Sequence, residues 1–140
     1  MKKLILCSAL LLSNYAVQAV TVEEYVKSKL DLLNLLLDQR MELSDQLTTA
    51  ESSKYIELSC KIRKLDNTQI YYLDQLSKDG IMCAKDKEFA KEIAEITENL
   101  SRDIKKAIII QDQEIRKEFK TNQNIKTFTL ETLCDHAGYK

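Results

Sequence analysis

Apolar residues recur at helical spacing along three long segments of the chain, over about 25–48, 58–78 and 87–120. Residues three and four apart share one face of a helix, so each pattern predicts a long amphipathic helix with one buried face. The three stripes read Leu33, Leu36, Leu43 and Leu47, then Leu58, Ile62, Leu65, Tyr72 and Leu76, then Phe89, Ile93, Ile96, Leu100, Ile104, Ala107, Ile115 and Phe119.

Helix-boundary signals are few, because the chain has no proline and only two glycines. Thr21 and Glu24 have the spacing of a capping box, which predicts the start of the first helix. Nothing in the sequence forces that helix to stop before Ala50. Gly80 predicts the end of the second helix, and Asp86 predicts the N-cap of the third.

Two points about the helices stay open at this level. The segment 64–68 either continues the second helix or holds a turn, with Asp66 capping a new helix. A short fourth helix is expected over 130–134. The pattern therefore predicts an all-α protein, an antiparallel helical bundle of three long helices plus a short C-terminal helix. A partner subunit that completes the bundle, giving a homodimer, is a further option.

The N-terminus has the form of a secretory signal peptide. Two lysines precede a short apolar run, and small residues follow at the expected cleavage site, so we expect 1–19 to be removed and 20–140 to form one domain. The expected location is the bacterial periplasm or the medium, without a membrane anchor after cleavage. Loss of Lys2 and Lys3 would leave 21 − 2 = 19 basic against 22 acidic residues. Nucleic acid is therefore not an expected partner, since a binding face would show a basic excess.

Three cysteines lie beyond the predicted signal: Cys60, Cys83 and Cys134. An oxidising compartment permits one disulfide among them. Cys83 and Cys134 both lie near predicted helix ends and are the favoured pair, although the sequence leaves the other pairings open. No close pair of ligands has the spacing of a metal site.

Each long helix carries one polar residue within its apolar stripe: Arg40, Gln69 and Gln111. Burial of an unpaired guanidinium costs several kcal/mol, and a lone amide about 1–3 kcal/mol, so these groups need partners. One interpretation is structural: Arg40 pairs with an acid such as Asp66 or Asp103, or extends its charged end to the edge of the bundle, and the glutamines set the helix register. The other is a core site in which one cation and two amides bind a small anion.

A second cation, Lys54, lies about four helical turns after Arg40 and therefore on roughly the same face. Together the two would suit a dicarboxylate, since arginine offers a bidentate fork and lysine a mobile point charge. A solvated surface lysine is the simpler interpretation of Lys54.

The segment 33–44 resembles the first helix of the all-helical (type II) chorismate mutases, in which a leucine-rich helix runs into an acid or amide and then arginine. Arg40 falls on the substrate-binding arginine of that family. The run 65–70, with Asp66 and Gln69, is similar to the second-helix motif of the exported, periplasmic subfamily. Gln111 falls where the third helix of the family carries a glutamine or glutamate.

This resemblance implies an isomerase that converts chorismate to prephenate by a Claisen rearrangement without a cofactor. Arg40 and Lys54 would bind carboxylates, Lys54 and Gln111 would donate to the ether oxygen, and Asp66 and Gln69 would orient the substrate. The chain departs from the family at several positions: Ile70 replaces a glutamate, Glu51 stands where the lysine is expected, and Glu23 stands where small members carry an arginine that reaches a partner's site. Lys61 is an alternative to Lys54.

A second hypothesis is a non-catalytic exported helical interaction protein, such as an adaptor, holdase or inhibitor, or an inactive descendant of a mutase. The two differ in what they require of the fold. An enzyme needs Arg40, Gln69 and Gln111 to line one cavity with a lysine at its rim. An internal carboxylate that neutralises Arg40 favours the interaction protein.

Overall fold

The computed structural model describes residues 21–83, 87–118 and 129–139, which fold into α2 (Val22–Leu47), α3 (Ser52–Cys83), α4 (Lys87–Glu118) and α5 (Leu130–His136). The prediction of an all-α protein with three long helices and a short C-terminal helix is confirmed. The predicted signal over 1–19 lies outside the described residues, as does Asp86, the predicted N-cap of the third helix.

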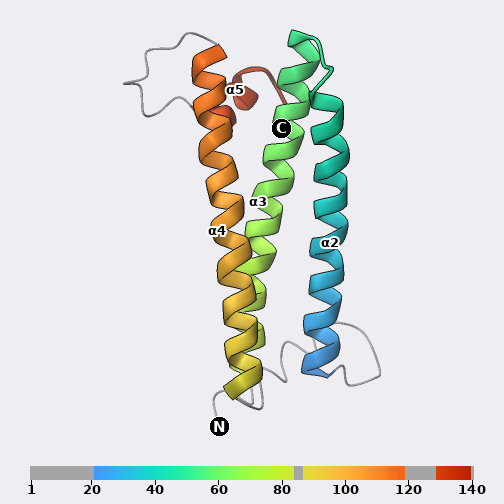
Figure 1. Ribbon diagram of the computed structural model, residues 1–140, viewed down its shortest axis with the longest axis vertical. Coiled ribbons are helices and arrows are strands. Elements are labelled where there is room, and N and C mark those ends of the chain that lie inside the picture. The colour runs from blue at the N-terminus through green and yellow to red at the C-terminus, as the bar shows by residue number, and fades with distance from the viewer. Residues whose placement is uncertain (1–20, 84–86, 119–128, 140) are drawn as a thin grey trace.

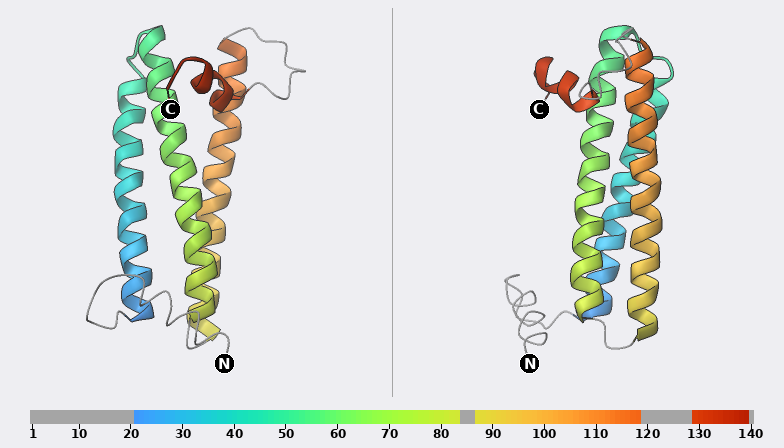
Figure 2. Two further views of the ribbon diagram at one scale, coloured as in Figure 1. Left: turned by 180° about the vertical axis from the view of Figure 1, so that it is seen from behind. Right: turned by 90° about the vertical axis from the view of Figure 1, so that its left-hand side faces the viewer.

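The central helix of the bundle is α3, which runs antiparallel to both α2 and α4 (Figure 1). Each of these two helices packs closely along α3, whereas the backbones of α2 and α4 stay apart in the described ranges and the two helices share only a side-chain core (Figure 2). The short helix α5 lies across one end of the bundle, against α3 and α4. The long helices therefore leave one side open between α2 and α4, and that opening positions the candidate site.

The start of α2 confirms the predicted capping box. The Glu24 backbone N–H donates to Thr21 Oγ1 at 3.1 Å, and the Thr21 N–H donates to Glu24 Oε2 at 2.9 Å. Two N–H groups that the first helical turn would leave unpaired thus gain acceptors. The helix ends at Leu47, before Ala50.

The second long helix is uninterrupted, so the segment 64–68 holds no turn. The prediction that it ends at Gly80 was wrong, because α3 continues to Cys83. Gly80 is buried inside the helix, where an added Cβ would come within 3.4 Å of the Ile93 side chain on α4. A Cβ at this position would make ordinary van der Waals contact, so Gly80 neither terminates its own helix nor is required by a close approach of its neighbour.

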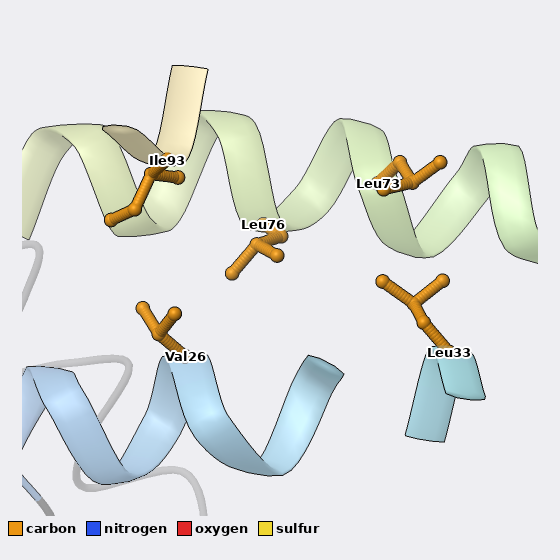
Figure 3. Packing of buried hydrophobic residues seen from close by; sticks show 5 residues of the cluster. All are labelled: Val26, Leu33, Leu73, Leu76 and Ile93. Atoms are coloured by element: carbon orange, nitrogen blue, oxygen red, sulfur yellow. The ribbon is translucent and has the colours of Figure 1, made fainter. Parts of the chain in front are cut away.

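The main core lies between α2, α3 and the first turns of α4, where apolar side chains from all three helices interdigitate (Figure 3). A second buried cluster lies under α5, at the opposite end of α4. Full burial of one such side chain contributes about 1.5–3 kcal/mol, so both clusters hold the helices together. The buried members are Val26, Leu33, Leu73, Leu76 and Ile93 in the first cluster, and Cys60, Ile115, Leu130 and Cys134 in the second.

Candidate functional site

Arg40 of α2 and Asp66 of α3 form an ion pair between the two helices. Arg40 Nε donates to Asp66 Oδ1 at 2.6 Å, and Nη2 donates to Oδ2 at 3.5 Å. The Asp66 side chain is 1% exposed, whereas that of Arg40 keeps 26% of its surface. Burial raises the pKa of the Asp66 carboxyl, although the hydrogen bond and charge of Arg40 lower it in part. Of the two acids expected as partners of Arg40, Asp66 is the one that it binds.

A pocket of about 240 Å³ opens beside this ion pair, between α2 and α4, with α3 as its floor. Arg40 and Gln69 both line it, so two of the three polar residues expected to converge do so. The remaining lining residues are mainly apolar: Leu33, Asn34, Leu37, Leu73, Leu100, Asp103, Ile104 and Ala107. We call this pocket and its edges the α2–α4 groove.

Gln111, the third polar residue, belongs to a different cluster. Its Oε1 accepts hydrogen bonds from Arg63 Nε at 3.3 Å and Nη2 at 3.2 Å. Arg63 also donates to the Ile108 carbonyl at 3.1 Å and to Asp112 Oδ1 at 2.8 Å. The amide of Gln111 therefore serves a buried arginine of the same chain.

Arg63 is the residue that sequence reasoning missed. It is 3% exposed, yet the neighbouring Lys61 and Lys64 make it look like part of a solvated basic run. The spacing along the helix was the signal that could have indicated its burial. Arg63 directly follows Ile62 of the apolar stripe and lies three residues before Asp66, so its side chain lies next to the buried face of the helix.

Lys54 lies at the first turn of α3, where it forms an ion pair with Glu57 at 3.1 Å. Lys61, its alternative, binds the same carboxylate at 2.6 Å. The two lysines hold the pKa of Glu57 below its usual range. Neither lysine lines the α2–α4 groove. The structure thus brings together Arg40, Asp66 and Gln69, and separates them from Gln111 and Lys54.

The charges of the α2–α4 groove do not suit an anionic ligand. Its one lining cation, Arg40, is bound to Asp66, and a further carboxylate, Asp103, lies on the opposite wall. Two acids therefore face one guanidinium. A dicarboxylate entering the groove would meet net negative charge, whereas an apolar side chain would meet leucine and isoleucine.

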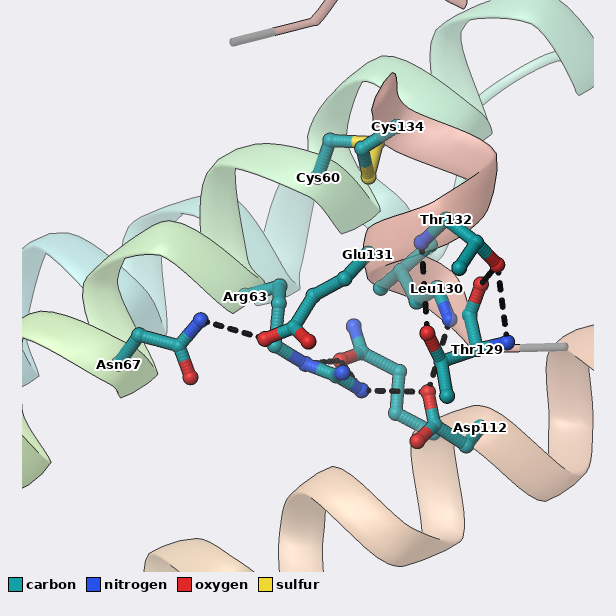
Figure 4. The surroundings of a disulfide bond; sticks show 10 residues. Cys60, Arg63, Asn67, Asp112, Thr129, Leu130, Glu131, Thr132 and Cys134 are labelled. Atoms are coloured by element: carbon teal, nitrogen blue, oxygen red, sulfur yellow. Dashed lines mark hydrogen bonds and ion pairs between the residues drawn. A yellow bond between two sulfur atoms is a disulfide. The ribbon is translucent and has the colours of Figure 1, made fainter. Parts of the chain in front are cut away.

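The short helix α5 is fastened beside Arg63 by a covalent bond and by hydrogen bonds (Figure 4). Cys60 of α3 and Cys134 of α5 form a disulfide, so the favoured pairing of Cys83 with Cys134 was wrong. The reason is topological: α5 folds back over the N-terminal half of α3, whereas Cys83 is the last residue of that helix. Asp112 Oδ1, already bound to Arg63, also accepts from the Leu130 N–H at 3.0 Å.

A larger hollow of about 500 Å³ runs along α3 and α5 above this disulfide. Its charged residues are three bases and three acids, and several pair with each other or with nearby side chains, as Asn67 Nδ2 does with Glu131 Oε1 at 2.7 Å. The lining residues are Glu57, Cys60, Lys61, Arg63, Lys64, Asn67, Thr68, Tyr71, Glu131, Cys134, Asp135 and Tyr139. The balance of charges indicates no particular ligand.

No helix in the described part of the chain is long and apolar enough to cross a membrane. The Cys60–Cys134 disulfide is consistent with an oxidising compartment. No protein-family model matches the chain, and comparisons with curated proteins and with solved structures found no match. The molecule is thus an all-helical protein of four described helices, with one side of its bundle open.

Proposed function

We propose that this chain is a non-catalytic helical interaction protein that binds an amphipathic partner helix in the α2–α4 groove. The observation that carries the proposal is the state of Arg40. A buried carboxylate of the same chain already neutralises it, while the groove beside it is open and mainly apolar. Such a site favours side-chain packing over the binding of a small anion.

The edges of the groove support a helical occupant. Leu37 on α2 is 44% exposed and Leu100 on α4 is 41% exposed, so large apolar side chains stand on both walls with solvent between them. A helix laid into an apolar groove anchors itself through residues at positions i, i+3, i+4 and i+7. Arg40 and Asp103 on opposite walls favour acidic residues along one flank of that helix and basic residues along the other.

A labelled synthetic helix tests this proposal. We expect a fluorescein-tagged peptide of three leucine heptads, with glutamate and lysine flanks, to raise its anisotropy on binding the purified protein. Leu100→Lys should weaken binding at least about tenfold, because it puts a charge on the groove wall. Ile109→Lys is the matched control, since Ile109 is exposed on α4 and does not line the groove. Binding that ignores Leu100→Lys, or no binding by the wild type, would contradict the proposal.

Chorismate mutase activity is a second candidate, and one observation favours it: Arg40, Asp66 and Gln69 lie together. These residues fall on the family positions that bind substrate. The other two members of the expected set are engaged elsewhere, Gln111 with Arg63 and Lys54 with Glu57. A dicarboxylate would therefore have to displace Asp66 from Arg40, which is why this function ranks second.

The purified protein, mixed with chorismate and followed by absorbance, separates the two candidates. Turnover that is lost in Arg40→Ala, with the helical circular dichroism spectrum retained, would establish the mutase and overturn the interaction protein as the main function. Absence of turnover by folded wild-type protein would eliminate the mutase and leave the interaction protein intact.

Export to the periplasm or medium is part of the proposal. The signal-like N-terminus over 1–19 and the Cys60–Cys134 disulfide support it. We expect mass spectrometry of the protein from a bacterial periplasmic fraction to show a chain that starts at Val20 and carries the disulfide. A reduced, full-length chain in the cytoplasmic fraction alone would contradict export.

A further inference from the structure

We infer that the partner helix anchors itself in the α2–α4 groove through a tyrosine, whose ring fills the pocket and whose hydroxyl pairs with the amide of Gln69. This inference rests on the proposed function, because it names the side chain that enters the same groove. It is carried by an unpaired buried amide, by the apolar walls around that amide, and by the volume of the pocket.

Gln69 lies on α3, at the floor of the pocket, and is 3% exposed. Within the described residues its side-chain amide has no hydrogen-bond partner, whereas the amide of Gln111, on the stripe of α4, accepts from Arg63. Burial of an amide without a partner costs free energy, so buried polar groups are usually paired. Because the side chain of Gln69 lines the pocket, a group that enters the pocket can reach this amide.

The walls around Gln69 are mainly apolar. Leucine, isoleucine and alanine side chains from all three long helices line the pocket, so an occupant must bury apolar surface against them. An apolar body with a polar tip therefore fits the pocket better than a wholly apolar or a wholly polar side chain. The apolar lining residues are Leu33, Leu37, Leu73, Leu100, Ile104 and Ala107.

The volume of the pocket suits a single aromatic side chain. An apolar cavity of about 150 Å³ holds one benzene ring, and pockets for drug-sized ligands begin at about 300 Å³. At about 240 Å³, the pocket of the α2–α4 groove lies between these values. It therefore has room for one ring that carries a polar substituent, whereas an aliphatic side chain would leave part of it empty.

The hydrogen-bonding groups of Gln69 select a hydroxyl as the polar tip. A glutamine amide offers a carbonyl oxygen that accepts and an NH₂ group that donates. A phenol hydroxyl can donate to the oxygen or accept from the nitrogen, whichever of the two the amide presents. The indole N–H of tryptophan only donates, and phenylalanine or leucine would leave the amide unpaired. Serine and threonine carry a hydroxyl but are too small to fill the pocket.

The charges beside the pocket disfavour an ionised anchor. Asp66 already neutralises Arg40, so a carboxylate entering the pocket would meet the net negative charge that Asp103 adds. A lysine or arginine would lose its hydration among leucine side chains and would lie near the guanidinium of Arg40. A tyrosine is neutral and avoids both costs, which is why we choose it over a charged residue.

Three versions of the labelled leucine-heptad peptide test the inference by fluorescence anisotropy. In each version one central leucine is replaced, by tyrosine, by phenylalanine or by tryptophan. We expect the tyrosine peptide to bind the wild-type protein at least about fivefold more tightly than the phenylalanine peptide, because its hydroxyl pairs with Gln69. Phenylalanine is the matched comparison, since it has the same ring and lacks only the hydroxyl. The tryptophan peptide should also bind more weakly than the tyrosine peptide.

The variant Gln69→Leu tests whether Gln69 is the group that recognises the hydroxyl. The preference for tyrosine should disappear in this variant, and the phenylalanine peptide should bind at least as tightly as the tyrosine peptide. Gln113→Leu is the matched control, because it makes the same substitution at an exposed position of α4 that does not line the pocket. In that control the preference for tyrosine should persist.

Urea unfolding of Gln69→Leu without peptide is a second measurement. The midpoint of unfolding should not fall below that of the wild type, because the substitution removes an unpaired buried amide and keeps a side chain of similar size. A clear fall in the midpoint would overturn the inference, since it would show that the amide already has a partner within its own chain.

The outcomes separate this inference from the function on which it rests. Equal binding of the tyrosine and phenylalanine peptides, with both weakened by Leu100→Lys, would overturn the tyrosine anchor and keep the interaction protein. Absence of binding by the leucine peptide and by all three of its versions would overturn both. A preference for tyrosine that survives Gln69→Leu would assign the hydroxyl to another group, and tighter binding of the tryptophan peptide would assign the pocket to an indole. Each of these last two results overturns the inference.

Discussion

Arg40 and Asp66 neutralise each other across the α2–α3 interface through a 2.6 Å contact between Nε and Oδ1. The acid is almost fully buried and the arginine stands at the edge of the groove, so the pair joins the core to the proposed interface. Asp66 of the same chain thus neutralises the arginine that interrupts the leucine stripe. The exposed part of the Arg40 side chain is available to a partner in the proposed interface.

We expect Arg40→Ala to destabilise the fold by about 3 kcal/mol at neutral pH, because it leaves the buried Asp66 carboxylate unpaired. Urea unfolding followed by circular dichroism measures the change. A double variant with an apolar pair, Arg40→Met/Asp66→Leu, should recover most of the loss, because it removes both charges together. A loss well below 1 kcal/mol in Arg40→Ala would contradict this view of the ion pair.

The same variant should show a characteristic pH dependence. Burial raises the pKa of Asp66, so the folded state binds a proton more readily than the unfolded chain. A raised acid pKa means that folding stability increases as pH falls through that pKa towards the ordinary value of 3.8. The destabilisation caused by Arg40→Ala should therefore shrink as the pH is lowered, and unfolding curves at several pH values measure it. A loss that is independent of pH would mean that Asp66 is not the group left unpaired.

Asp112 should matter more than its partial exposure suggests, because one oxygen accepts from both Arg63 and the Leu130 N–H. We expect Asp112→Asn to cost about 3 kcal/mol, since it removes the negative charge facing a buried guanidinium. Faster hydrogen exchange in α5 should accompany the loss. Asp103→Asn, an exposed acid on the same helix, is the control and should change stability by less than about 0.5 kcal/mol.

The Cys60–Cys134 disulfide closes a loop across 74 residues and holds a helix of only seven residues. A helix this short is not stable alone, so its position depends on the covalent link and on the burial of Leu130. We expect Cys60→Ser/Cys134→Ser to lower the free energy of unfolding by about 4 kcal/mol and to expose α5 to proteolysis. Reductant should reproduce the effect in the wild type and add nothing in the double variant. An unchanged α5 would mean that packing alone holds it.

Tyr25 should ionise later than an ordinary tyrosine. Burial and the negative charge of Asp79, to which its hydroxyl donates at 3.1 Å, raise the pKa of Tyr25 to about 12. Because the folded pKa lies above the ordinary 10.0, this stabilisation is complete below pH 10 and is lost as the pH rises through about 12. The difference in tyrosinate absorbance between the wild type and Tyr25→Phe should show this titration. A difference curve centred at 10 would contradict it.

The periodic signals in the sequence were sufficient for the helices. Period-3.6 stripes and the Thr21 capping box depend on neighbours within a few residues, and both are reproduced in α2. The prediction at Gly80 failed because a glycine near the end of an apolar stripe favours a helix end, whereas in the fold Gly80 is buried against Ile93 of α4 and the helix continues to Cys83. Arg63 was missed for a related reason, since its burial depends on acceptors more than forty residues away on α4.

By itself, the sequence determined which segments are helical and that Arg40 on its apolar stripe needs a partner, with Asp66 and Asp103 as the internal candidates beside a bound anion. Only the tertiary structure decided that Asp66 is that partner, that Gln111 binds Arg63, and that Cys60, not Cys83, reaches Cys134. The physical reason is range. Helix formation and capping are set by local hydrogen bonds, whereas the pairing of buried charges and sulfurs depends on which faces of distant helices meet.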